Sequence, residues 1–239
     1  MEKKILDFIL VPSGLLVLMS YHLWLLHRII KNPTKTVIGV NAIDRRLWVR
    51  EMMEDASKNG VRAVESLRTN IRASFSVVWT AIMLIWFNAV FINYNGAEES
   101  QMTMLCRNGS QQCFKFFAIG VCFMVAVLMH FQSTWYYCQA SILINVPFKK
   151  ECPNIEQQIV KSDYVAALVN RGSHFSSLGL RAFYFSFPTS MWLLGPIPMF
   201  VSCFVLVLWL YVMDVVLAEY GNQNRTRDVE AAAEISSSN

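Results

Sequence analysis

Four long apolar stretches restrict this sequence of 239 residues to one class of fold. A helix needs about 20 apolar residues to cross the hydrocarbon core of a bilayer, and each stretch has about that length. The stretches run from residues 5 to 26, 74 to 92, 116 to 137 and 191 to 213. Charged residues are almost absent from them, and Trp or Tyr lies near several of their ends, as is typical of membrane interfaces. We therefore predict an all-α integral membrane protein with four transmembrane helices.

The four predicted spans organise the rest of the chain. We expect residues 1–220 to form one membrane domain and residues 221–239 to be a disordered polar tail. The connections between the first and second spans and between the third and fourth spans are long. We expect both of these connections to be partly helical.

Residue patterns in the two long connections predict where their helices begin and end. Asn41 and Asp44 have the spacing of a helix cap, and no proline follows them before Phe91. This pattern predicts one continuous helix that runs from the first connection into the second span. In the other connection, residues 154–170 have an amphipathic pattern, and Gly172 is the expected end of that helix.

The distribution of positive charge predicts the orientation of the chain in the membrane. Fifteen of the 21 Lys and Arg residues lie in or beside the two long connections, and six lie on the other side. The positive-inside rule therefore places both long connections in the cytosol and both termini in a lumen or outside the cell. Lys3 and Lys4 are exceptions to this distribution.

Residues that secreted and lumenal proteins modify occur on the predicted lumenal side. Cys106 and Cys113 lie in and beside the short connection between the second and third spans, and they are a candidate disulfide pair. Asn108 and Asn224 begin candidate glycosylation sequons on the same side. Because sequons also arise by chance, modification and coincidence both remain open.

The sequence contains no common motif of a catalytic or nucleotide-binding site, and its four His residues are scattered. We therefore expect no enzyme, no catalytic residue, no cofactor and no metal site. We also expect no nucleic-acid partner, because the basic residues Arg45, Arg46 and Arg50 are interleaved along the helix with Glu51, Glu54 and Asp55.

Polar residues within the spans suit an ion path, although interhelical hydrogen bonding explains each stripe better when it is taken alone. Thr80 and Asn88 are predicted to share a face of the second span. A second polar stripe follows the third span and comprises His130, Ser133, Thr134, Tyr137 and Ser141.

Acidic residues gather at the predicted lumenal ends of the spans. The candidates are Glu98, Glu99, Asp214 and Glu219. Taken alone, each one is better explained as an ordinary solvated charge. In a symmetric homo-oligomer, however, one such residue per copy would form a ring of carboxylates that concentrates cations. We therefore predict an oligomeric cation channel in membrane lipid, permeable to Ca²⁺, K⁺ or Na⁺.

A non-conducting membrane adaptor is the alternative function. Its cytosolic helices would recruit partner proteins, and its spans would serve as an anchor. This alternative predicts that the acidic residues tolerate neutralisation.

Several strings of residues resemble one membrane protein family. They are residues 39–50, 68–74, 131–137 and 170–188, followed by Trp192 and residues 195–200. The family is the one named domain of unknown function 599, and the resemblance is to its plant branch over about residues 5–220. The resemblance implies four membrane helices. Through one plant member, it also implies a pentameric, calcium-permeable cation channel of the endoplasmic reticulum that acts in plant immunity. It assigns no pore residue.

Overall fold

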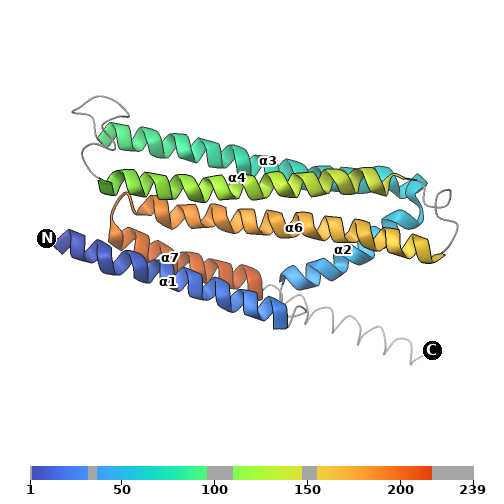
Figure 1. The fold of residues 1–239 in the computed structure, drawn as a ribbon, viewed down its shortest axis with the longest axis horizontal. Helices are drawn as coiled ribbons and strands as arrows, with labels where there is room; N and C mark the ends of the chain where they lie inside the picture. Colours follow the sequence, from blue (N-terminus) through green and yellow to red (C-terminus); the bar gives the residue numbers. More distant parts are fainter. Residues whose placement is uncertain (1, 32–36, 96–109, 147–154, 217–239) are drawn as a thin grey trace, which may run out of the picture. The chain divides into compact units, whose positions relative to one another are not determined.

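The computed structural model describes residues 2–31, 37–95, 110–146 and 155–216. These residues form helices and turns and no strand, which confirms the predicted all-α class (Figure 1). The helices are α1 (Glu2–Lys31), α2 (Val37–Glu54), α3 (Ala56–Asn95), α4 (Ser110–Ile144), α6 (Ile155–Met191) and α7 (Pro196–Tyr211), followed by the π-helical turn η2 (Val212–Val216).

Four segments of these helices are long and apolar enough to cross a membrane, which confirms the four predicted spans. They are Asp7–Lys31 in α1, Lys58–Val90 in α3, Phe114–Ile144 in α4 and Pro196–Val216 in α7 with η2. Large apolar side chains face outward from them. Trp79, for example, is 62% exposed and Leu208 is 66% exposed. Such an outward apolar surface suits lipid, so the chain is an integral membrane protein.

The chain divides into two compact units. One unit comprises residues 1–44 and 200–239, and in it α1 and α7 lie side by side (Figure 1). Gly14 of α1 makes their close approach possible, because a Cβ atom at this position would lie 3.2 Å from Sγ of Cys203.

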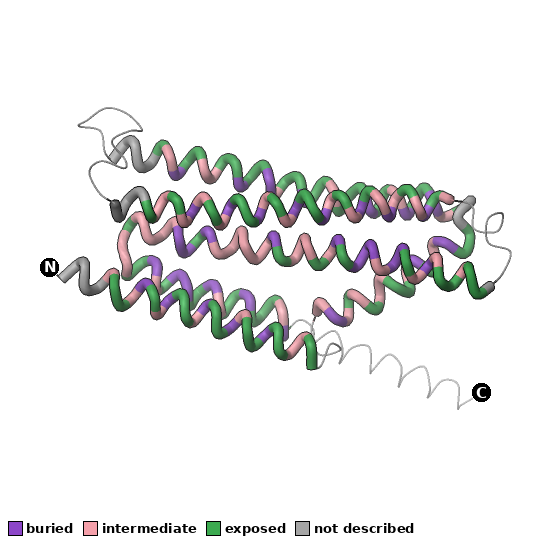
Figure 2. Tube along the Cα trace, in the orientation of Figure 1, coloured by how far each residue is buried: buried purple, intermediate pink, exposed green. Residues whose placement is uncertain are grey.

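The second unit comprises residues 45–199, in which α4 packs against both α3 and α6. Figure 2 shows buried residues recurring along all three helices. At the end where α2 joins, the unit has an apolar core like that of a soluble protein. Its buried members are Val49, Met53, Ala63, Leu67, Tyr137, Ala140, Ile144, Val165, Ala166, Leu168 and Val169. Burial of each large side chain stabilises such a core by about 1.5–3 kcal/mol.

Closer to the middle of α4, glycines of α6 allow the two helices to approach. A Cβ atom at Gly179 would lie 2.9 Å from Cδ2 of His130, and one at Gly172 would lie 3.1 Å from Cε1 of Tyr137. The prediction that Gly172 ends the helix is therefore wrong, since α6 continues through it to Met191. The glycine serves a close helix contact and not a helix end.

The prediction of one continuous helix into the second span is also wrong. The helix breaks at Asp55, between α2 and α3. The Asp55 carbonyl oxygen accepts a hydrogen bond from the backbone N–H of Asn59 at 2.9 Å. The Asp55 carboxylate accepts one from the backbone N–H of Lys58 at 3.3 Å. Asp55 therefore caps the start of α3, as Asp commonly does at a helix N-terminus.

The glycine contacts predict how α6 responds to a single added methyl group. We expect Gly179→Ala to lower the free energy of unfolding by about 1–3 kcal/mol, because the methyl group would push His130 and α4 away. Gly120→Ala is the matched control, since no atom lies within 4 Å of a Cβ at that position. Thermal unfolding of the purified protein in detergent measures both. Equal midpoints for the two variants would contradict the close approach.

Candidate functional site

The predicted site residues fall into two groups. Thr80, Asn88 and Asp214 lie among the described residues. Outside them lie Glu98, Glu99, Glu219, Cys106, Asn108 and Asn224, together with the side chain of Cys113, whose backbone belongs to α4. The acidic pair, the candidate disulfide and both sequons therefore stay predictions.

Thr80 and Asn88 lie on α3 in different environments. Thr80 is exposed, and its hydroxyl donates a hydrogen bond to the carbonyl oxygen of Ser76 at 2.8 Å. Asn88 is only 6% exposed, and its amide donates to the carbonyl oxygen of Leu84 at 2.7 Å. Eight residues of α-helix turn by about 80° more than two full circles, so the two side chains do not point the same way. The structure thus does not bring them together.

The polar stripe of α4 faces the interior of its unit over part of its length. Ser133 is fully buried, and its hydroxyl donates a hydrogen bond to the carbonyl oxygen of Gly172 at 2.7 Å. Ser133 therefore takes the interhelical alternative. His130 is 2% exposed and lies against Gly179. Neither of its ring nitrogens has a hydrogen-bond partner among the described residues.

Asp214 is held by a residue of α1. The hydroxyl of Tyr21 donates a hydrogen bond to Oδ2 of Asp214 at 3.0 Å. One turn away, the rings of Trp24 and Tyr211 lie 6.2 Å apart. Asp214 itself lies in the π-helical turn η2 at the end of α7. Its carboxylate thus has a structural partner in its own unit, and no local sequence pattern indicates it because Tyr21 lies 193 residues away along the chain.

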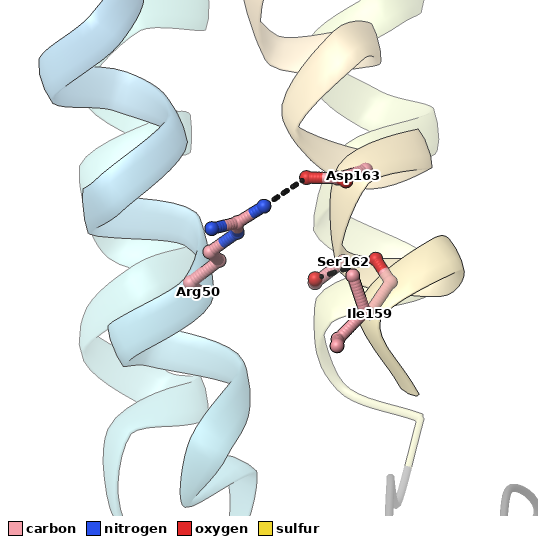
Figure 3. A network of polar contacts seen from close by, with 4 residues as sticks. All are labelled: Arg50, Ile159, Ser162 and Asp163. Carbon is pink, nitrogen blue, oxygen red and sulfur yellow. Dashed lines mark hydrogen bonds and ion pairs between the residues drawn. The ribbon is translucent and has the colours of Figure 1, made fainter. Parts of the chain in front are cut away.

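Polar contacts join α2 to α6 at the end of the 45–199 unit. The guanidinium of Arg45 donates to Oδ1 of Asn170 at 2.9 Å. Arg50 and Asp163 form an ion pair at 2.9 Å, which Figure 3 shows bridging the two helices. The side chains of this pair are 52% and 46% exposed. Asn170, by contrast, is buried.

The two α2–α6 contacts are expected to differ in strength. We predict that Asp163→Asn lowers the free energy of unfolding by less than about 1 kcal/mol, because water screens the exposed pair. Arg45→Gln is expected to cost more, about 1.5–3 kcal/mol, because the hydrogen bond that it removes has a charged donor and a buried acceptor. Unfolding midpoints of both variants, compared with the wild type, measure this order. The reverse order would contradict it.

His174 of α6 lies near Arg45. Partial burial lowers the pKa of His174 below its ordinary value of 6.5, and the positive charge of Arg45 lowers this pKa further. The folded state therefore resists protonation more than the unfolded chain does. The contribution of neutral His174 to the free energy of unfolding is complete above pH 6.5. It is lost as the pH falls through this value toward the lower pKa of His174 in the folded state.

A pH series tests this linkage. We expect the wild type to lose more thermal stability between about pH 7.5 and about pH 5.5 than His174→Gln does, since the variant has no imidazole to protonate. A parallel pH profile for His174→Gln and the wild type would show that His174 does not contribute.

Within the described part of the chain, no group of three or more His, Cys, Asp and Glu residues could hold a metal ion. The described cysteines Cys122, Cys138 and Cys203 are free thiols. The described groups therefore offer hydrogen bonds, one buried imidazole and apolar surface.

Comparison with protein families assigns the chain. A family model described as "Protein of unknown function, DUF599" matches residues 9–218. The chain belongs to this family. The DUF599 match covers all but the first two residues of the four apolar spans, and it includes α2 and α6. No curated protein and no solved structure matches the chain.

Proposed function

We propose that this DUF599 protein is not an enzyme and assembles as a homo-oligomer around a central path that conducts cations, Ca²⁺ included. The sequence resemblance favours a pentamer in the endoplasmic reticulum that feeds calcium signalling in plant defence. K⁺ and Na⁺ would share the path, because carboxylates attract all three cations.

The outward face of α3 carries this proposal. Ser76 and Thr80 are one turn apart within the apolar span, and both side chains are exposed. Their hydroxyls donate to the carbonyl oxygens of Ala73 and Ser76 of the same helix, at 2.8 Å each. Small hydroxyl side chains on the outer face of a span suit close contact with another transmembrane helix. A second copy of the chain would supply that contact.

The interior of the 45–199 unit supports a path between copies over a path within one copy. Asn88, His130 and Ser133 are polar residues at the level of the spans, and all three are buried in close packing. A hydrated channel needs a wider lumen than such packing leaves. Oligomerisation would create this lumen from the outer faces of the spans.

Charge would act at both ends of the proposed path. A ring of Glu98 and Glu99 from several copies would concentrate cations at one mouth. On the other side, Arg62, Arg68 and Arg72 are exposed on α3. These residues would contact anionic lipid headgroups around the periphery, because the same charges at the path itself would repel cations.

A membrane adaptor is the second candidate function. Apolar side chains are exposed on the first turns of α6, outside the four apolar spans. Val160 is 66% exposed and Tyr164 is 58% exposed. A partner protein could cover this surface.

Current recordings from the purified protein in a planar bilayer test the channel. We expect a cation-selective reversal potential in asymmetric salt. We also expect the double variant Glu98→Gln and Glu99→Gln to reduce calcium current at low salt by roughly tenfold, and less at high salt, because salt screens the ring. Glu156→Gln, which removes an exposed carboxylate at the start of α6, is the matched control.

The outcomes separate the alternatives. Cation current that the double variant leaves unchanged would reject Glu98 and Glu99 as the ring and keep the channel. The absence of current from a folded oligomer, verified by light scattering, would reject the channel and favour the adaptor.

A further inference from the structure

Helix α6 lies against α4 in the opposite direction. Contacting residues run in opposite directions along the two helices, so the pair is antiparallel. The contacts are Tyr136 with Phe175 at 5.5 Å between ring centroids, Phe123 with Phe183 at 5.9 Å, and Nζ of Lys115 with the carbonyl oxygen of Trp192 at 3.0 Å. Residues 175–191 of α6 thus lie beside the apolar span Phe114–Ile144, and they reach its N-terminal end.

The composition of residues 175–191 suits the part of the membrane that the apolar span of α4 occupies. Residues 175–191 are 17 residues with one charged side chain, Arg181. A segment of about 17 residues is long enough to cross a bilayer. Ser186 and Thr189 donate hydrogen bonds to carbonyl oxygens within α6, at 2.6 Å and 3.1 Å, which lowers the cost of hydroxyls in an apolar medium. The hydroxyls and Arg181 explain why the segment lacks the hydropathy of the four spans.

The direction of the helices in the other unit also requires a further crossing. Contacting residues of α1 and α7 run in the same direction, so these helices are parallel. Gly14 lies against Cys203, and ten residues or fewer further along α1 Tyr21 and Trp24 contact Asp214 in η2 and Tyr211 at the C-terminal end of α7, respectively. In a chain that crosses a membrane four times in alternation, the first and last spans are antiparallel. A fifth crossing between α4 and α7 makes them parallel, as observed.

We infer that residues 175–191 of α6 are a fifth membrane crossing, so that the two termini lie on opposite sides of the membrane. The N-terminus then shares a side with residues 96–109, and the C-terminal tail shares a side with α2. This placement differs from the orientation that four crossings predict. It also increases the excess of Lys and Arg on the side of the membrane that carries α2. Sixteen Lys and Arg residues lie on the side of α2, four lie on the other side, and Arg181 lies within the crossing.

The fifth crossing changes which carboxylates share a side. Asp214 at the end of α7 moves to the side of α2, away from Glu98 and Glu99. This consequence for a cation path rests on the proposed channel, whereas the crossing itself does not. A ring at the mouth opposite α2 would then contain Glu98 and Glu99 without Asp214.

A split fluorescent protein tests the topology in the full-length chain. The small fragment is attached to the N-terminus, to the C-terminus, or as an insertion after Gly109, and the large fragment is expressed in the cytosol or in the lumen. We expect the C-terminal fusion to fluoresce with the cytosolic fragment alone. The N-terminal fusion and the insertion should fluoresce with the lumenal fragment alone.

Each result decides the question, because every location gives a positive signal with one detector. Fluorescence of both terminal fusions with the same detector would overturn the fifth crossing. The native sequons give a second readout. We expect no glycan at Asn224, so the Asn224→Gln variant and the wild type should show the same change in mass on glycosidase treatment. A glycosidase-sensitive mass that Asn224→Gln abolishes would also overturn the inference. Current recordings are a separate measurement, so loss of the channel proposal leaves this result unaffected.

Discussion

The close antiparallel contact of α4 and α6 is the interaction on which the 45–199 unit depends. It combines two kinds of packing in one helix pair. Toward the end where α2 joins, burial of apolar side chains away from water holds the helices together. Beside the apolar span of α4, that driving force is absent, and association depends on close packing and hydrogen bonds. Gly179 and the bond from Ser133 to Gly172 supply these.

The four apolar spans could be predicted because their signal is local. A run of about 20 apolar residues without charge is rare outside membrane-spanning helices. The path of α6 could not be predicted in the same way, because Gly172 and Pro188 are typical of helix ends and α6 contains both. Glycine also serves close approach, and only the partner helix distinguishes the two uses. The break at Asp55 was missed because its cap lies inside a run that otherwise favours helix.

The sequence predicts which polar residues lie within the spans, but it does not predict how their side chains are arranged. Polar residues within the spans are visible in the sequence, but the direction in which each one points depends on tertiary contacts. Thr80 and Asn88 separate into an exposed and a buried side chain. The partner of Asp214 comes from the other end of the chain, and no local pattern links it to Tyr21.

The polarity of α6 bears on how the chain is made. A helix with several hydroxyls and an arginine partitions poorly into a bilayer by itself. Because α4 is synthesised before α6, it can be in place to receive that helix during biogenesis. The face of α4 that carries His130 and Ser133 is then the surface against which α6 packs as it inserts. Given the inferred fifth crossing, a variant that disrupts this face would impair the insertion of α6 before any activity of the mature protein.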